Sequence, residues 1–221
     1  MIIVNDMPNQ IDESLVQLLA KVETATVGHF LTGVFMPPDI RPVIIEKTAV
    51  GTAVTLSLPG MDSTLLHYAM GLVRPGDVIL IDRGKDSVNA CWGGFMAAAA
   101  QKAKIAGVVI DGTATDPAEL RRSEVPVWCK GISPVTTRIG GDTGMLNVPI
   151  DCGGITVNPG DAVIADESGV LVLPPDRVQD VANKAIEMQE EEVKDLELLR
   201  QGRSVPDITG AGEMIQALIQ S

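Results

Sequence analysis

Apolar and polar positions along this chain repeat with two different periods, and each period predicts a type of element. Apolar residues recur at helical spacing over residues 12–22, which predicts an amphipathic helix. Residues 48–58 alternate and are rich in β-branched side chains, which predicts a strand with a bend at its glycine. A strand at 77–81, a helix at 88–104 and a strand at 108–110 then predict a parallel strand–helix–strand unit.

The segments between and after this unit complete a mixed α/β pattern. Residues 62–73 have a capped start and predict a helix, and a proline at position 117 favours a short helix over 118–122. A short strand is predicted at 125–130. After residue 140, short apolar runs are divided by glycine-containing turns, which is typical of antiparallel hairpins.

The C-terminal part of the chain is predicted to be helical. Residues 176–200 predict a long acidic helix, and residues 213–219 carry apolar side chains at helical spacing. A helix as short as the second must dock on its own core or on a neighbouring subunit. We therefore expect one α/β domain over residues 1–221, with residues 176–221 as a C-terminal helical extension.

Composition narrows the classes of function. A chain of 221 residues can bury a substantial core, and with 45% hydrophobic but only 3% aromatic residues that core is aliphatic. The formal net charge of −12 argues against a footprint on a phosphate backbone, and the scarcity of aromatic residues argues against stacking on bases. We expect no nucleic-acid partner, although a small local anion site remains compatible with the acidic chain.

The cysteines and the N-terminus indicate the compartment. Cys91, Cys129 and Cys152 are widely spaced, so the sequence predicts buried reduced thiols rather than a structural zinc site. The N-terminus lacks a basic region followed by a long apolar run, and no apolar run reaches about 18 residues. We therefore expect a cytoplasmic protein with no signal peptide and no contact with a membrane.

The candidate chemistry lies between residues 76 and 116. The helix opening at Trp92-Gly93-Gly94 would present bare N–H groups and a positive dipole end to an anion. Asp111 and Asp116 follow the next predicted strand, where a carboxylate can hold a hard divalent cation. Other interpretations stay open, because Asp116 before Pro117 also suits a helix N-cap and the two glycines also suit close helix–strand packing.

A series of segments in one order carries a family resemblance. They are PGDVILID, the WGG helix start, AGVVIDGTATDPAEL, VPVWCKGISP, and NVPI-CGGITVNPGDAVIADESGVLVLP. Together they resemble the RraA-like family, which includes class II 4-hydroxy-4-methyl-2-oxoglutarate aldolases and the regulator of ribonuclease E activity A. The resemblance covers residues 24–202. It implies an α/β layered sandwich of the swivelling phosphohistidine-domain type with a mixed sheet.

The resemblance also implies an assembly and a chemistry. Subunits would form homotrimers or homohexamers with active sites at their interfaces. Aldolase members use a divalent metal, usually magnesium or manganese, to cleave 2-oxo acids with release of pyruvate, and many decarboxylate oxaloacetate. We therefore expect a divalent metal as cofactor and a small anionic substrate.

Family site positions fall on identifiable residues of this chain. The backbone amides that hold the pyruvate carboxylate correspond to Gly93, Gly94, Phe95 and Met96, and the metal-binding carboxylate corresponds to Asp116. The family also has a glutamate ten residues ahead of a glycine, given to the site of the next subunit. Counting back from Gly202 places that residue at Glu192, with Glu190 and Glu191 adjacent. The simplest interpretation of the acidic run is a solvated helix face.

Two positions depart from the family pattern. The acidic residue that helps to relay protons is replaced by Gly94, and the arginine that pairs with the substrate carboxylate and oxyanion is replaced by Thr115. A hydroxyl gives one neutral hydrogen bond where an arginine gives a charged, bidentate pair. We hypothesise that Lys85 supplies the lost positive charge; a solvated turn lysine is the alternative, and rival cations are Arg121, Arg122 and Arg138.

The sequence thus predicts a metal-dependent carbon–carbon lyase, of the aldolase or decarboxylase type, acting on a small oxo or hydroxy acid. Asp116 would hold the metal, and Asp86, Glu192 or a water would move the proton. Because of Gly94 and Thr115, the substrate is expected to differ from the usual family aldol. The alternative is a non-catalytic regulatory protein of the ribonuclease-inhibitor type. His29 and His67 are expected to be packed or surface residues.

Overall fold

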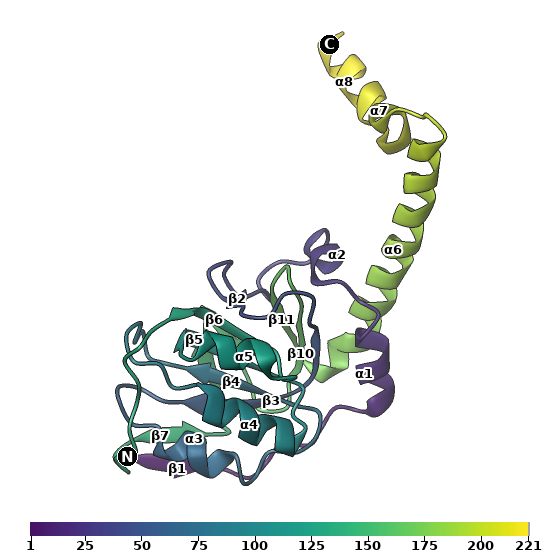
Figure 1. Cartoon of the computed structure of the whole chain (residues 1–221). Coiled ribbons are helices and arrows are strands. Elements are labelled where there is room, and N and C mark those ends of the chain that lie inside the picture. The colour runs from purple at the N-terminus through teal and green to yellow at the C-terminus, as the bar shows by residue number, and fades with distance from the viewer. Residues whose placement is uncertain (221) are drawn as a thin grey trace.

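The computed structural model describes residues 1–220 as a helix-covered mixed sheet from which a helical arm projects (Figure 1). Four parallel strands form the centre of the sheet in the order β3-β4-β5-β6. They are β3 (Ala49–Ser57), β4 (Asp77–Asp82), β5 (Gly107–Ala114) and β6 (Val127–Ile132). The parallel strand–helix–strand unit predicted from the sequence is therefore confirmed.

The outer edge of β3 pairs with two different strands. The antiparallel hairpin of β10 (Ala162–Ala165) and β11 (Val170–Leu173) lies against its first half. β7 (Gly144–Leu146) pairs antiparallel with its second half, and β1 (Ile2–Val4) extends β7 in parallel. At the opposite edge, β2 (Arg41–Pro42) pairs antiparallel with β6.

A separate hairpin joins β8 (Ile150–Cys152) to β9 (Ile155–Val157). Its turn residues, Gly153 and Gly154, have φ values of 63° and 76°, the left-handed region that two-residue hairpin turns require. The hairpins predicted after residue 140 are confirmed by this pair and by β10–β11.

Alternating strand residues divide the core into two layers. Ile79 and Ile81 of β4 face a cluster built with α3 (Thr64–Ala69), α4 (Gly94–Ala103) and α5 (Pro117–Arg122), which lie on one face of the sheet (Figure 1). Val78 and Leu80 face a second cluster that includes side chains of β8–β9 and β10–β11. The predicted layered α/β fold is therefore confirmed.

Several element boundaries differ from the sequence prediction. The helix predicted at 88–104 begins only at Gly94, because Ala90 and Trp92 make extended bridges to Thr136 and Ala114. β5 runs beyond residue 110 through an irregularity between Ile110 and Thr113. The helix predicted at 62–73 is reduced to α3, and the short elements β1, β2 and α2 (Thr24–Gly28) were not predicted.

The C-terminal segments form an arm. After the short 3₁₀ turn η1 (Pro175–Arg177), α6 (Val178–Arg200) packs its first turns on α1 (Glu13–Leu19) and α2, and its last buried residue is Ala185. The helix then leaves the body and leads to α7 (Val205–Thr209) and α8 (Ala211–Ile219), neither of which has a buried residue (Figure 1). Docking of the last helix on its own core, one of the two predicted alternatives, is therefore wrong.

Two further expectations concern the cysteines and a membrane. Cys91, Cys129 and Cys152 are buried free thiols, as predicted. Across residues 1–220, no helix combines the length and the apolar character needed to cross a bilayer.

Candidate active site

The end of β5 brings two sequence-predicted residues against the start of α4. Trp92 forms a bridge with Ala114, and the Thr115 N–H donates to the Trp92 carbonyl at 2.8 Å. The chain then turns at Asp116, which has the left-handed values φ 51° and ψ 50°. This turn directs the Asp116 side chain back toward Gly93 and Gly94 rather than along its own helix.

The Asp116 carboxylate caps α4, the neighbouring helix. Its Oδ2 accepts a hydrogen bond from the Gly94 N–H at 3.0 Å, whereas α5 receives no capping bond from this side chain. A Cβ on Gly93 would lie 2.6 Å from Oδ2 of Asp116 and 2.7 Å from Cγ2 of Thr115, so only glycine permits this approach. Gly93 therefore permits close packing, as one interpretation of the sequence held. Asp116 stands at the N-cap position of α5, but its side chain caps α4.

A pocket of about 170 Å³ opens beside this contact. Gly93, Phe95, Met96, Thr115 and Asp116 line it among the predicted residues. Sequence reasoning missed the other polar side chains of the wall, which are Ser63, His67, Thr136 and Thr137. The sequence offered no signal for them, because they come from the start of α3, from α3 itself and from the loop after β6, and they meet only in the fold.

His67 is an exposed residue of α3 rather than a packed one. Its ring stacks on Phe95 with 6.2 Å between ring centroids and 23° between ring planes. Both residues also line an adjoining apolar groove of about 450 Å³ between α3 and α4. The pocket therefore has a polar wall with several hydroxyl groups near Asp116 and an apolar extension past the Phe95 ring.

Cys91 lines the same pocket but is not a nucleophile. Burial raises the pKa of its thiol to about 11, even though the positive charge of Arg83 acts in the opposite direction. A thiol with that pKa is protonated at neutral pH, and the thiolate is the reactive species.

Lys85 and Asp86 lie in the loop after β4, and neither lines the pocket. Burial of Asp86 opposes its ionisation, but hydrogen bonds from Asn89 and Val88 and the charge of Arg83 prevail and lower the pKa of its carboxyl. The Asp86 oxygens are thus occupied in holding their own loop. Lys85 is exposed, with a φ of 71°.

A buried arginine that the sequence analysis did not single out organises this loop. The Arg83 guanidinium donates to the carbonyls of Leu58, Gly60 and Asn89 and to the Asp86 carboxylate. Its side chain passes against Gly112, where a Cβ would lie 2.5 Å from Cγ of Arg83. Arg83 therefore ties the ends of β3, β4 and β5 together behind the pocket.

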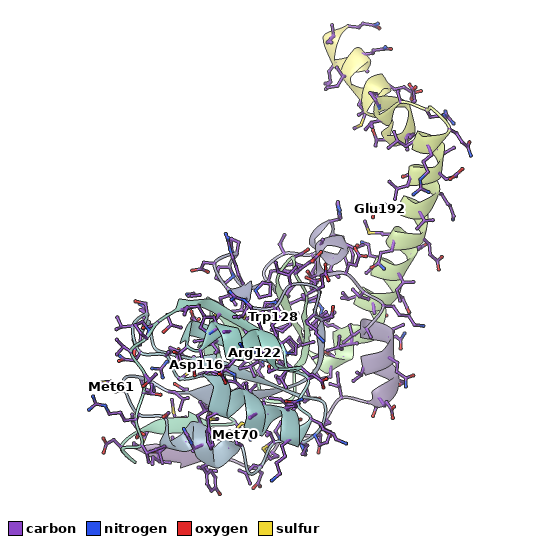
Figure 2. The ribbon with its side chains drawn as sticks, in the orientation of Figure 1. Met61, Met70, Asp116, Arg122, Trp128 and Glu192 are labelled. Carbon is purple, nitrogen blue, oxygen red and sulfur yellow. The ribbon has the colours of Figure 1, made fainter. Side chains whose placement is uncertain are left out.

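The other predicted carboxylates lie elsewhere. Asp111 falls inside β5, where its carboxylate pairs with Lys130 and accepts from the Gly153 N–H at 2.8 Å, on the hairpin side of the sheet. Glu192 is exposed on the projecting part of α6, remote from Asp116 in the same chain (Figure 2). The three rival arginines, Arg121, Arg122 and Arg138, do not line the pocket.

The donor set near Asp116 suits one kind of cation. Across residues 1–220, no three side chains of histidine, cysteine, aspartate or glutamate gather in a way that could hold a metal. Zinc sites in proteins need three or four such ligands, whereas Mg²⁺ keeps several waters and binds through one or two carboxylates and the substrate. The Asp116 carboxylate and the surrounding hydroxyls therefore fit a magnesium-like ion and do not fit zinc.

The fold and the site define an α/β sandwich protein whose helix α4 is capped by an aspartate from the end of a parallel strand. A family model described as RraA-like, Aldolase/RraA, matches residues 23–172. The chain belongs to the RraA-like family, as the sequence resemblance indicated.

Individual relatives agree with this membership. A Halalkalibacterium halodurans protein, named provisionally as a 4-hydroxy-4-methyl-2-oxoglutarate aldolase, is 32% identical over 169 residues, which are 76% of this chain and 80% of the relative. The crystal structure of Streptomyces coelicolor RraAS2, described as an unusual member of the RNase ES inhibitor RraA family, has a TM-score of 0.74 at 26% identity and covers 85% of this chain and 99% of its own.

A third likeness concerns the fold alone. An uncharacterised Pseudomonas syringae protein has a TM-score of 0.78 at 23% identity, over 94% of this chain and 98% of its own. An alignment of that extent includes most of the C-terminal arm, so the arm belongs to a fold already seen in a crystal.

Proposed function

We propose that this chain is a divalent-metal-dependent carbon–carbon lyase of the aldolase or decarboxylase type, acting on a small oxo or hydroxy acid. The observation that carries the proposal is the 3.0 Å contact between Oδ2 of Asp116 and the N–H of Gly94. This contact supports the proposal because it brings a carboxylate, a group that can bind metals, to the N-terminus of α4 beside one small pocket. Family membership together with the names of the aldolase relatives supports the lyase class.

The residues of the chain supply binding and orientation. Asp116 uses the Gly94 amide, and the amides of Phe95 and Met96 follow at positions that have no partner within a helix. These amides and the helix dipole would hold a substrate carboxylate next to Asp116. A magnesium or manganese ion held by Asp116 would polarise the substrate carbonyl and stabilise an enolate.

The polar wall of the pocket indicates which kind of substrate would fit. Thr115 stands where the family has an arginine, so its hydroxyl would give the substrate a neutral hydrogen bond in place of a charged pair. Lys85 lies outside the pocket wall and would need a movement of its loop to replace that charge. A substrate different from the usual family aldol, with an apolar part that fits beside Phe95, agrees with this wall.

The site would be completed by a second copy of the chain in a homotrimer or homohexamer. Glu192 and its acidic neighbours are exposed on the part of α6 that leaves the body, remote from Asp116 of the same chain, which supports a contribution to the site of a neighbouring subunit. Exposed Met214 and Ile215 on α8 support the same assembly, because a short helix with an exposed apolar face is stabilised by packing on a partner.

Thermal unfolding with ligands tests the proposal. Mg²⁺ or Mn²⁺ together with pyruvate or oxalate should raise the Tm by about 5 °C at roughly a hundredfold excess over Kd. Each metal and each acid alone serve as controls, and turnover is measured as metal-dependent decarboxylation of oxaloacetate. A flat Tm with every combination and no turnover would remove the lyase proposal.

A regulatory function is the second candidate. The acidic exposed run over residues 190–197 and the ribonuclease-inhibitor description of RraAS2 support it, because an acidic surface can imitate nucleic acid toward a basic partner. Inhibition of a purified ribonuclease, without any response to metals or acids, would favour this function over the first.

A further inference from the structure

The pocket beside Asp116 continues into the apolar groove between α3 and α4. His67, Phe95 and Met96 line both cavities, so the two share one wall. The rest of the groove, which has a volume of about 450 Å³, is lined by Met70, Gly71, Ala99, Lys102 and Ala103. A ligand that occupies the pocket can therefore extend into the groove without leaving the surface of the protein.

The groove follows one face of α4. Phe95, Ala99 and Lys102 are four and then three residues apart, a spacing that puts side chains on the same side of a helix. At 1.5 Å per residue, Phe95 and Lys102 are separated by about 10 Å along the helix axis. Because Asp116 lies at the N-terminus of α4, the groove leads away from the candidate metal site toward the far end of the helix.

The wall of the groove suits an aliphatic chain. Met70 and Met96 have flexible, polarisable side chains that adapt to an apolar ligand, and the alanines of α4 leave room beside them. The Phe95 ring is 77% exposed, so it would be removed from water when a chain lies across it. Burial of apolar surface of this kind favours binding.

The pocket offers no cation for a second acidic group of a ligand. Among the described residues, no lysine or arginine lines it, and the Lys102 side chain at the far end of the groove is exposed. A ligand held by its carboxylate at the start of α4 therefore meets apolar surface over most of its remaining length.

We propose that the groove between α3 and α4 binds the aliphatic chain of the substrate, so that the site takes unbranched 2-oxo acids longer than pyruvate. The inference rests on the proposed lyase function, because Asp116 and the start of α4 would place the carboxylate end. Phe95 determines this specificity because it forms part of the shared wall, and Ala99 does so because its small side chain keeps the groove open.

Adjacent alanines of α4 provide a matched pair of variants. Ala99→Leu places a larger side chain in the groove, whereas Ala98→Leu adds the same atoms at an exposed position that lines neither cavity. Leucine is a strong helix former, so both variants should keep the helix. Neither alanine lines the pocket beside Asp116, so pyruvate binding reports whether that pocket is intact.

Titration calorimetry at a fixed Mn²⁺ concentration measures the dissociation constants of pyruvate, 2-oxobutanoate and 2-oxohexanoate. Each CH₂ that enters the half-open groove should strengthen binding about two- to fourfold, so 2-oxohexanoate should bind at least about tenfold more tightly than pyruvate. The heat capacity change of binding should become more negative with chain length. Ala99→Leu should bring 2-oxohexanoate to within about threefold of pyruvate, whereas Ala98→Leu should keep the wild-type preference.

Four results would overturn the proposal. Equal affinity of the wild type for pyruvate and 2-oxohexanoate rejects the groove as a binding site and leaves the lyase function standing. The same preference in Ala99→Leu and Ala98→Leu places the chain elsewhere. A change in the mass measured by light scattering for Ala99→Leu alone identifies the groove as an interface between copies of the chain. A wild type that binds none of the acids with Mn²⁺ and does not decarboxylate oxaloacetate rejects the lyase function and the groove together.

Discussion

Oδ2 of Asp116 lies 2.6 Å from the place that a Cβ on Gly93 would take, so the aspartate occupies room that only a glycine leaves. Gly93→Ala should displace the carboxylate and weaken the folded state by about 1–3 kcal/mol. Urea unfolding and the Mn²⁺-dependent rise in Tm measure both effects. The matched control is Gly169→Ala, where a Cβ meets nothing within 4 Å. Equal behaviour of the two variants would contradict the steric argument.

Replacing Asp116 should separate capping from metal binding. Asn in its place can still accept the Gly94 N–H, so Asp116→Asn is expected to unfold within about 1 kcal/mol of the wild type. The lost negative charge should abolish the Tm rise with Mg²⁺ or Mn²⁺. Thermal unfolding with and without each ion measures this, and a full metal response in the variant would rule out Asp116 as the ligand.

Asp62 should make the free energy of unfolding sensitive to acid. Its buried carboxylate accepts bonds from the Thr64 hydroxyl and N–H and from the N–H groups of Gly140, Asp142 and Thr143. These bonds, led by that from the Thr64 hydroxyl, outweigh desolvation and hold the pKa of Asp62 well below its usual range.

A lowered folded pKa stabilises the protein above the unfolded value of about 4, and this contribution is lost as the pH falls toward the folded pKa. Asp62→Asn should therefore lower the free energy of unfolding by about 2–3 kcal/mol near neutral pH and by less in acid. Urea unfolding at about pH 7 and about pH 3 measures this difference. A deficit that stays constant with pH would show that the charge of Asp62 is not the cause.

The β8–β9 turn offers a pair of variants that differ in one respect. Gly153 and Gly154 both have positive φ, so alanine at either costs about 1–2 kcal/mol in backbone strain. At Gly153 a Cβ would also lie 2.7 Å from Cδ of Pro37, whereas at Gly154 it meets nothing within 4 Å. Gly153→Ala should be the more destabilising variant in chemical unfolding, and the reverse order would be inconsistent with this packing.

The exposed face of α8 predicts an effect on assembly. Met214 and Ile215 are 69% and 56% exposed, and both should be covered in an oligomer. Met214→Ser/Ile215→Ser should shift the mass measured by light scattering toward the monomer, because each buried apolar side chain contributes about 1.5–3 kcal/mol. Val205→Ser, an exposed apolar residue of α7, is the comparison, and an unchanged mass for the α8 variant would exclude that face from the interface.

The sequence predicted the central elements because their patterns are local. β4 and the hairpins have continuous or alternating apolar runs with glycine turns, and these signals do not depend on distant residues. The start of α4 was placed too early, since the segment before Gly94 also reads as apolar. Only its bridges to β5 and to Thr136 hold that segment extended.

The candidate site could be predicted only in part, for a physical reason. Asp116 follows a predicted strand and Gly93-Gly94 stand at the start of a predicted helix, so local sequence was enough to single these residues out. Ser63 and His67 reach the same pocket through the packing of α3 beside α4, which no pattern of neighbouring residues encodes. The close approach of the Glu119 side chain to Gly94, which is far away in the sequence, is likewise visible only in three dimensions.

The number of residues in α6 beyond Ala185 sets the direction in which α7 and α8 face, as well as their distance from the body. The stretch from there to Arg200 carries no buried residue, but the Gln189 side chain still hydrogen-bonds the backbone of Lys21 and Glu23. Beyond Gln189 the helix extends about 16 Å at 1.5 Å per residue. Deleting one residue from it would turn everything beyond by about 100°, whereas deleting seven would nearly restore the direction and shorten the reach by about 10 Å. A change in the length of the arm therefore keeps α7 and α8 facing the same way only when it is close to a whole number of helical turns.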